Sequence, residues 1–473
     1  PRPEGMLADF DGRLPSALTE GQALVGEEIA ADLALEHPMH RLLQGEVGAG
    51  KTVVALRAML QVVDAGGQAV LLAPTEVLAQ QHHRSISGML GELAQGGMLG
   101  GTAVGLLTGS MGAAARRSAL LDAASGNAGI VVGTHALLQE HVQFADLGLV
   151  VVDEQHRFGV QQRDALREKA GGGRPHVLVM TATPIPRTVA MTVFGDLEVS
   201  TLSQLPSGRA PITTHVVPAA DKPHYLERTW ERVREEVALG RQAYIVCPRI
   251  GDLEGDEGDL EALSGEDDKR PPLAVLDVAQ LLSEGPFHDL RLGVLHGKLP
   301  PEEKDAIMRA FSRGELDVLV ATTVIEVGVD VPNSSVMIIM DADRFGVSQL
   351  HQLRGRVGRG GLPGLCLLVS DFPENTPARA RLDAVAATLD GFELSRVDLE
   401  QRREGDVLGA AQSGKRSSLK LLQLLRDEDV IETAREEAAA LLEKDPDLIS
   451  NAPLRAEIDR LLEDEKAEYL EKT

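Results

Sequence analysis

Short apolar runs alternate with longer amphipathic stretches over the first 200 residues of the chain. The apolar runs lie at 69–73, 104–107, 130–132, 149–152 and 177–180, and small polar residues follow each of them. A continuous apolar run of this kind is typical of a strand buried on both faces of a parallel sheet. Because parallel strands end at one edge of the sheet, we expect the polar residues that follow to form a ligand-binding edge.

The same alternation returns in the second half of the chain. Apolar segments at 243–246, 292–295, 318–321, 336–340 and 365–369 alternate with helical stretches such as 222–239 and 302–311. The sequence therefore predicts an α/β protein with two tandem parallel-sheet domains and a C-terminal helical region. The expected parts are a leading segment 1–17, a first domain 18–205, a Pro/Gly/Ser/Thr-rich linker 206–222, a second domain 223–389 and charged helices over 390–473.

Composition indicates an ordinary globular protein, with 43% hydrophobic and 25% charged residues. No apolar run is long enough to span a membrane, and the start has no signal-peptide layout, so we expect a cytoplasmic protein without a membrane partner. The missing initiator methionine suggests a fragment or a processed chain. We expect Cys247 and Cys366 to be reduced, buried thiols. His82 and His83 are expected on a solvated helix face rather than as a metal-ligand pair.

The net charge of −25 at first argues against a polyanionic partner. The charge is uneven, however: residues 251–268 hold nine acids and no base, and residues 426–473 carry a net charge of −9. The rest of the chain carries a net charge of −7. The acidity belongs largely to an expected solvated insert and a tail, so charge alone does not exclude a nucleic-acid groove.

One segment fits the pattern G-x-x-x-x-G-K-[ST], which wraps the phosphates of a nucleotide: Gly45-Glu46-Val47-Gly48-Ala49-Gly50-Lys51-Thr52. An apolar strand precedes it and a helix-forming run follows, as the motif requires. Lys51 is expected to reach the β- and γ-phosphates, and the Thr52 hydroxyl to ligate Mg²⁺. The alternative is a glycine-rich turn before an ordinary helix.

Asp153 and Glu154 follow the apolar strand at 149–152. Asp153 is expected to make a second Mg²⁺ contact and Glu154 to orient or deprotonate the attacking water; a simple helix N-cap is the alternative. Thr19 is a plausible N-cap for a helix over 18–35, in which Gln22 either reads an adenine edge or lies at the surface.

Three arginines spaced by glycines occur in Gln352-Leu353-Arg354-Gly355-Arg356-Val357-Gly358-Arg359. Guanidinium groups stay charged and bind phosphate in a fork. If the second domain closes over the first, Arg356 and Arg359 can reach the γ-phosphate as arginine fingers. A basic, solvated loop is the alternative.

Together these motifs resemble those of superfamily-two helicases, and closely those of the RecG family of bacterial ATP-dependent DNA helicases. The resemblance runs from about Leu14 to the end of the chain. It includes the motifs at 44–52, 73–76, 153–160, 181–188, 296–297 and 321–330 and the arginine motif. It implies two RecA-like domains of the P-loop NTPase type, with ATP and Mg²⁺ as cofactors.

The resemblance also implies roles for individual residues. Gln22, Gly328 and Asp330 would contact the nucleotide. One DNA strand would be held through its backbone by Pro74, Thr75, Thr108, Gly109, Thr134, His296, Gly297, Thr322 and Thr323. Coupling between the sites would involve Gln155, His156, Thr181, Thr183, Arg402 and Gln412, the last two within a translocation motif that begins at Asp390.

The expected function is an ATP-driven translocase that remodels branched double-stranded DNA, such as forks and Holliday junctions, as a monomer. One residue that favours the RecG family, two departures from it and two alternative functions bear on this expectation. Gln155 favours the RecG family over the related transcription-repair coupling translocases. The stretch 402–405 reads Arg-Arg-Glu-Gly where the family often has Arg-Gly-Pro-Gly, and the junction-binding wedge domain that the family places before the motor is not expected among these residues. An RNA helicase and a nucleotide-gated scaffold without turnover are the alternatives.

Overall fold

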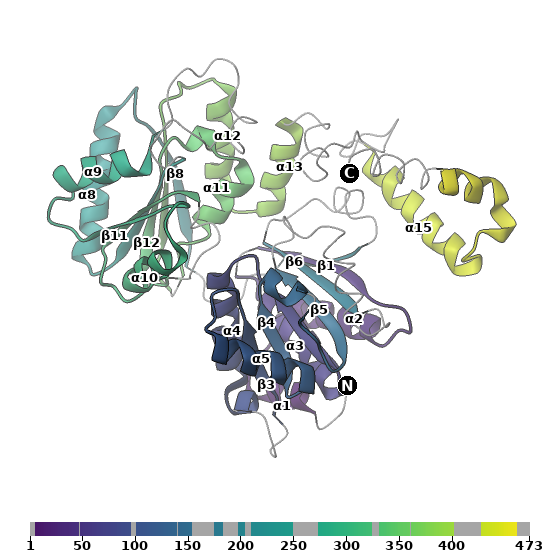
Figure 1. Cartoon of the computed structure of the whole chain (residues 1–473). Helices are drawn as coiled ribbons and strands as arrows, with labels where there is room; N and C mark the ends of the chain where they lie inside the picture. Colours follow the sequence, from purple (N-terminus) through teal and green to yellow (C-terminus); the bar gives the residue numbers. More distant parts are fainter. Residues whose placement is uncertain are drawn as a thin grey trace. The chain divides into compact units, whose positions relative to one another are not determined.

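The structure is a computed structural model of the whole chain (Figure 1). The residues it describes are 5–46, 48–95, 101–139, 141–153, 175–182, 197–203, 210–248, 273–323, 331–359, 361–401 and 427–460. Two α/β lobes, each built on one parallel sheet, account for most of them. The expected fold class of two tandem RecA-like domains with C-terminal helices is confirmed.

The first lobe is built on a seven-stranded sheet in the order β3-β4-β2-β5-β6-β1-β7, with parallel pairing throughout. Its strands are β1 (His40–Gly45), β2 (Gln68–Leu72), β3 (Ala103–Leu107), β4 (Ala128–Gly133), β5 (Leu147–Asp153), β6 (His176–Thr181) and β7 (Glu198–Leu202). All the predicted apolar runs of this half are strands. Their carboxyl ends carry the predicted polar residues along one edge.

Helices α1 (Met6–Arg13), α2 (Glu20–Leu33), α3 (Lys51–Asp64) and α4 (Glu76–Leu90) pack into one apolar core. That core takes alternate side chains from the strands, including Leu71, Val132 and Val151, because side chains of a strand alternate between the faces of its sheet. Helix α5 (Ala113–Ser125) lies against β3 and β4. Thr19 caps α2 as predicted, accepting the backbone N–H of Gln22 at 3.2 Å.

The second lobe is built on a six-stranded parallel sheet in the order β10-β11-β9-β12-β13-β8. The strands are β8 (Ile212–Pro218), β9 (Gln242–Val246), β10 (Leu292–Leu295), β11 (Val318–Ala321), β12 (Ser334–Ile339) and β13 (Gly364–Ser370). Its helices are α8 (Pro223–Ala238), α9 (Val275–Glu284), α10 (Pro301–Ser312), α11 (Val347–Arg354), α12 (Pro377–Ala387) and α13 (Gly391–Gln401). Tyr244 and Val246 of β9 enter one core while Ala243 and Ile245 enter the other, so both faces of this sheet are buried.

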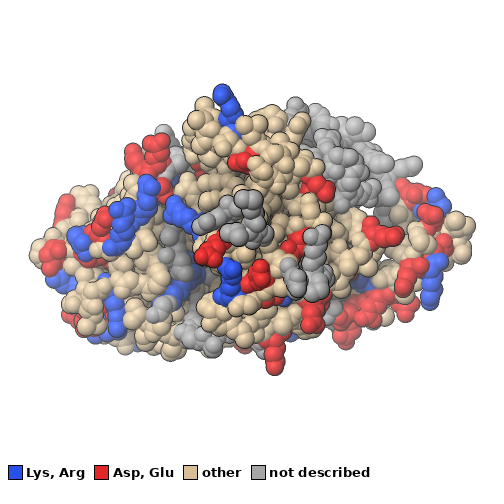
Figure 2. All heavy atoms as spheres, turned by 90° about the horizontal axis from the view of Figure 1, so that it is seen from below, with Lys and Arg blue, Asp and Glu red and all other residues tan. Residues whose placement is uncertain are grey.

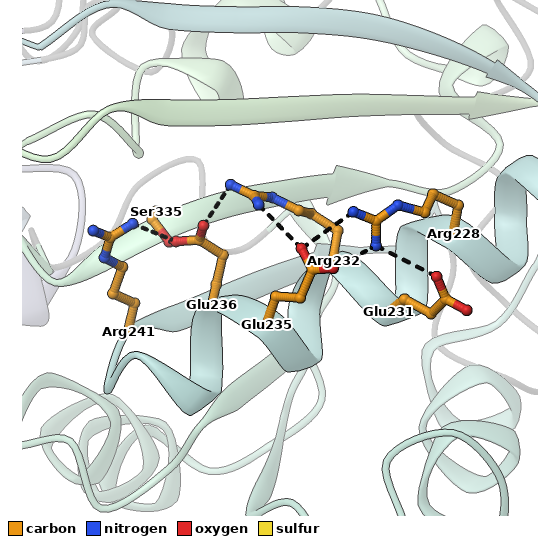
Figure 3. A network of polar contacts seen from close by, with 7 residues as sticks. All are labelled: Arg228, Glu231, Arg232, Glu235, Glu236, Arg241 and Ser335. Atoms are coloured by element: carbon orange, nitrogen blue, oxygen red, sulfur yellow. Dashed lines mark hydrogen bonds and ion pairs between the residues drawn. The ribbon is translucent and has the colours of Figure 1, made fainter.

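A polar network joins α8 to the second sheet (Figure 3). Glu236 is buried, and its carboxylate accepts hydrogen bonds from Arg232 at 2.6 Å, Arg241 at 2.8 Å and the Ser335 hydroxyl at 2.6 Å. Outward on the same helix, Glu235 accepts bonds from Arg228 and Arg232. The buried Glu236 carboxylate is tolerated because two guanidinium groups and a hydroxyl donate hydrogen bonds to its oxygens.

Three elements differ from the sequence-based prediction. The leading segment contains α1, which is fastened to α3: Asp64 accepts the backbone N–H groups of Met6 and Leu7, and Arg57 bonds Asp11 with two nitrogens. The expected linker contains β8, an edge strand of the second sheet. Its β-branched residues favour a strand, but flanking prolines and glycines obscured it. The short edge strand β7 was also not predicted.

Residues 427–460 belong to the second of the two compact units of the chain. Its described part holds helix α15 (Glu428–Lys444), as the charged helical pattern predicted, and the short 3₁₀ helix η6 (Ile449–Asn451). Asp445 accepts the backbone N–H groups of Ile449 and Ser450, each at 2.8 Å. Within the described residues, no helix has the length and apolar character needed to cross a membrane.

Candidate functional site

The phosphate-type loop joins β1, which lies between β6 and β7, to the start of α3. Gly48 and Gly50 have φ of +88° and +84°, a backbone region that glycine enters without steric cost. A Cβ on Gly50 would lie only 2.2 Å from Nε2 of Gln22. The loop therefore needs glycine at this position both for its backbone conformation and for the space beside it.

Gln22 fastens α2 to this loop. Its side-chain oxygen accepts the backbone N–H of Thr19 at 3.0 Å, and its Nε2 donates to the carbonyl of Ala49 at 3.0 Å. The residue is buried, so the surface alternative is wrong. An amide nitrogen carries two hydrogens, so the contact with Ala49 is compatible with a second one to a base edge.

Lys51 and Thr52 open α3, where the helix N-terminus favours anions. The Lys51 ammonium donates to the loop carbonyls of Gly45 at 2.6 Å and Glu46 at 2.9 Å, which holds it over the loop. A loop with two glycines of positive φ, a helix N-terminus and one ammonium group are together features that suit phosphate oxygens.

Asp153 ends β5 and is bonded to His82 of α4. The distance from His82 Nε2 to Asp153 Oδ2 is 2.5 Å, and the two side chains are 13% and 16% exposed. The neighbouring His83 Nε2 contacts the carbonyl oxygen of Val104 at 3.0 Å. The prediction of a solvated face for the two histidines is therefore wrong.

The inward position of His82 follows from its spacing along α4. Residues 78, 82, 86 and 90 recur at four-residue intervals, which places them on one face of α4. Leu78, Ile86 and Leu90 of that face are buried in the core of the first lobe. An inward stripe that includes one histidine is the signal that could have identified this residue.

Several residues predicted to hold a nucleic-acid strand follow the strands of the first sheet. Thr75 caps α4, its hydroxyl accepting the backbone N–H of Leu78 at 3.3 Å. Thr108 and Thr134 are buried, with 1% and 2% exposure, and the Thr134 hydroxyl accepts the backbone N–H of Ala136. Contacts from Thr108 and Thr134 to a nucleic-acid strand would therefore come from their main-chain atoms. Pro74 and Gly109 lie in the turns beside them, and Thr181 is buried at the end of β6.

The matching residues of the second lobe also follow its strands. His296 and Gly297 come after β10, and Thr322 and Thr323 come after β11. Burial, with added repulsion from the charges of Lys304 and Lys298, lowers the pKa of His296. Thr322 is buried, and the Gly297 carbonyl accepts the Lys304 ammonium at 2.5 Å.

The arginine motif divides into a fully buried and a half-buried part. Arg354 is 1% exposed and donates to the carbonyls of Val385 at 2.6 Å and Thr388 at 2.7 Å, which ties α11 to the end of α12. Arg356 and Arg359 follow α11 and are half-buried, and Arg359 Nε donates to the Gly355 carbonyl at 3.0 Å. Arg354 therefore anchors the segment that carries the other two arginines.

Glu46 in the phosphate-type loop contacts the start of α13. Its Oε1 accepts the backbone N–H of Gly391 at 2.9 Å and lies 3.8 Å from His351 Nε2. The sequence pattern places Glu46 only in the expected nucleotide loop, and nothing in that local pattern indicates a partner 345 residues away.

Some predicted site residues lie outside the described residues: Val47, Glu154, Gln155, His156, Thr183, Gly328, Asp330, Arg402 and Gln412, with the acidic insert 251–268. Their assignments stay predictions. Among the residues that the structure does describe, no cluster of three or more His, Cys, Asp or Glu side chains is arranged to hold a metal ion. Both cysteines are free and buried, as predicted; burial raises the pKa of the Cys366 thiol to about 12.

Three family profiles match the chain in order. Residues 20–192 match "DEAD/DEAH box helicase", 270–361 match "Helicase conserved C-terminal domain", and 388–468 match "ATP-dependent DNA helicase RecG, domain 3, C-terminal". The ATP-dependent DNA helicase RecG of Mycobacterium tuberculosis is 58% identical over 437 residues, and that of Bacillus subtilis is 45% identical over 439. The chain is therefore similar in sequence to RecG helicases along most of its own length.

The match covers most of this chain but only part of those relatives. It takes in 91% of the chain and 58% of the M. tuberculosis RecG, and 93% and 60% for B. subtilis. A solved structure titled "Structure of RecG bound to three-way DNA junction" has a TM-score of 0.69 and 38% identity over 90% of this chain and 52% of its own. A solved structure of Mss116p bound to single-stranded RNA and AMP-PNP has a TM-score of 0.58 at 17% identity, over 93% of this chain and 84% of its own, and so supports the fold alone.

Proposed function

We propose that this chain is the motor of an ATP-dependent DNA helicase that translocates on duplex DNA and remodels branched substrates such as forks and Holliday junctions in recombination and repair. The observation that carries the proposal is the likeness to the structure of RecG bound to a three-way DNA junction. The two sequences are 38% identical over a match that covers 90% of this chain. The RecG-specific profile over 388–468 supports it, because general helicase profiles match only the two lobes.

The first lobe supplies the nucleotide site. Loop N–H groups and the N-terminus of α3 bind the phosphates, and Lys51 turns its ammonium group from the loop carbonyls toward the β- and γ-phosphates. Gln22 keeps the loop in place through Ala49 and reads the adenine with its remaining hydrogen.

Thr52 and Asp153 suit Mg²⁺, which is held in nucleotide sites by one or two protein oxygens together with the phosphates. A hydroxyl at the start of α3 and a carboxylate at the end of β5 are the oxygen donors this requires. When bound, Mg²⁺ neutralises charge on the phosphate oxygens. Glu154, next to Asp153, orients the attacking water and accepts its proton.

The second lobe supplies Arg356 and Arg359, whose guanidinium groups stabilise charge on the transferring phosphoryl group. The contact between Glu46 and Gly391 supports a nucleotide loop that meets the start of the translocation motif, so that a change at the phosphates moves α13.

Nucleic-acid binding is expected to use the backbone rather than the bases. Aromatic residues make up 3% of the chain, which leaves few platforms for base stacking. On the face shown in Figure 2, Lys and Arg are interspersed with Asp and Glu rather than gathered in one basic field. Turns at Thr75, Gly109 and Gly297 offer backbone N–H groups to phosphates, which positions a duplex without reading its sequence.

The test compares ATP hydrolysis by the chain with no nucleic acid, with linear duplex DNA, with forked DNA and with duplex RNA, at several salt concentrations. The proposal predicts the strongest stimulation by DNA, the largest rate on forks, and DNA affinity that falls steeply with salt because phosphate contacts release counterions. Equal or stronger stimulation by RNA would favour an RNA helicase. Nucleotide binding without hydrolysis under every condition would favour a scaffold.

A further inference from the structure

Helix α4 connects the nucleic-acid edge of the first lobe to the carboxylate at the end of β5. Its first turn carries Thr75 and Glu76, and His82 lies about 10 Å further along its axis at a rise of about 1.5 Å per residue. His82 is on the inward face with Leu78, Ile86 and Leu90. A polar ring on an apolar stripe destabilises the fold unless it finds a partner.

Asp153 is that partner, for reasons that start from the strand. Leu149, Val151 and Asp153 of β5 point to one face of the sheet, because side chains alternate along a strand. Leu149 and Val151 pack in the same core as the inward residues of α4. The last side chain of this row therefore meets α4, and Asp153 Oδ2 lies 2.5 Å from His82 Nε2.

The direction of this hydrogen bond follows from the two groups. A carboxylate only accepts, so the His82 Nε2 carries the hydrogen and donates it to Oδ2. The bond fixes the χ2 angle of Asp153, which is otherwise broadly distributed in aspartate side chains. The second oxygen, Oδ1, is then presented in a fixed direction.

We propose that His82 is a positioning residue for Asp153: it engages Oδ2 so that Oδ1 faces the Mg²⁺ that accompanies the nucleotide. This inference rests on the proposed nucleotide site and adds a residue to it. Partners that orient a metal-binding side chain in this way commonly change metal affinity by about 10- to 100-fold when they are removed. Thr75 and Glu76 lie at the start of the same helix. A DNA strand that displaced this end of α4 would therefore also displace His82 and, with it, the Asp153 carboxylate.

The test uses two substitutions at one position and a neighbouring control. His82→Leu supplies apolar bulk for the inward stripe but has no donor, whereas His82→Gln keeps an N–H at similar reach. His83→Ala removes the next histidine, which contacts Val104 rather than Asp153. Each protein is titrated with Mg²⁺ in the presence of a fluorescent ATP analogue, and nucleotide binding is read directly, without turnover.

We expect the Mg²⁺ midpoint to rise about 10-fold or more in His82→Leu, to return most of the way in His82→Gln, and to stay within about twofold in His83→Ala. Nucleotide affinity in EDTA should be the same for all of them. A His82→Leu midpoint equal to or below that of the unsubstituted chain would overturn the assignment, as would a full rise in His82→Gln. If the unsubstituted chain shows no Mg²⁺-dependent nucleotide binding, the proposed function fails before His82 is at issue.

Discussion

Glu76 and Ser110 are joined across the carboxyl edge of the first sheet. Glu76 Oε1 accepts the backbone N–H of Ser110 at 3.0 Å, and Oε2 accepts the Ser110 hydroxyl. Glu76 begins α4 directly after Thr75, while Ser110 follows Thr108 and Gly109 beyond β3. One carboxylate thus links two turns that we assign to the grip on a DNA strand.

Glu76→Ala should weaken DNA binding, because it frees the 108–110 turn from α4. These hydrogen bonds are exposed, so their loss should cost no more than the low end of the about 1.5–3 kcal/mol that is typical of bonds to charged groups, and an affinity loss of about 10-fold is expected. Glu76→Gln keeps an acceptor for Ser110 and removes a negative charge near the phosphates, and it should bind DNA at least as tightly as the unsubstituted chain. Fluorescence anisotropy with a labelled fork measures both, and weaker binding by Glu76→Gln would contradict this account.

Gly50→Ala should abolish tight nucleotide binding. The new Cβ would meet Gln22 Nε2 at 2.2 Å and would sit in a left-handed backbone conformation. Gly66→Ala is the matched control, because Gly66 has φ of +95° but open space around it. We expect Gly66→Ala to lower the unfolding temperature slightly, through strain of about 1 kcal/mol, and to leave nucleotide affinity unchanged. Equal losses of nucleotide affinity in the two variants would show that the loss in Gly50→Ala comes from backbone strain and not from the clash with Gln22.

Glu236→Ala should destabilise the second lobe. It removes the acceptor shared by Arg232, Arg241 and the Ser335 hydroxyl, and since both arginines are partly exposed and can be solvated we expect about 1–3 kcal/mol (Figure 3). Glu231→Ala, at an exposed ion pair on the same helix, should change stability by less than about 0.5 kcal/mol. Urea unfolding followed by the fluorescence of Trp230 in α8 compares them, and equal shifts would contradict the role of burial.

His176 should make the stability of the first lobe depend on pH. Burial is the main cause that lowers its pKa, and charges on His40 and His37 add to it against the opposing effect of Asp32. Nδ1 accepts the backbone N–H of Met39 at 2.8 Å, which requires that nitrogen to be unprotonated. Because the folded pKa lies below the unfolded value of about 6.5, this contribution is complete above that value and is lost as the pH falls below it.

The matched variant is His176→Asn, whose side-chain oxygen can accept the same N–H without titrating. Denaturant midpoints of the two proteins measured from pH 8 to pH 5 should diverge below about pH 6.5, with the larger decrease in the unsubstituted chain. Parallel curves would exclude His176 as a source of the pH dependence.

The strands buried on both faces were predictable because their apolar runs are continuous and local, as at 149–152 and 336–340. Helix α1 and strand β8 were not, because what stabilises them lies far away in sequence. Asp64 holds the first turn of α1, and β8 pairs along its whole length with β13. Pro and Gly beside such short elements predict a linker when only the local pattern is considered.

The loop between β1 and α3 and the place of Asp153 at the end of β5 were predictable because contiguous residues indicate both. The residues that contact these side chains could not be predicted, even where helical spacing offered a signal. His82 and His83 are the same residue type at adjacent positions, and only their positions around the α4 axis show that His82 faces inward. Arg354 belongs to the same motif as Arg356 and Arg359, yet its bonds to Val385 and Thr388 make it structural, and no local pattern shows those carbonyls.

The central claim is that two lobes share one hydrolytic site, and steady-state ATP hydrolysis with forked DNA by Arg359→Ala tests it most directly when nucleotide affinity is measured alongside. Arg313→Ala, at an exposed arginine of the second lobe, is the control. We predict that Arg359→Ala lowers kcat by about 10³-fold while nucleotide Kd changes less than about threefold, because the guanidinium stabilises charge that develops in the transition state. An unchanged kcat in Arg359→Ala would contradict the shared site.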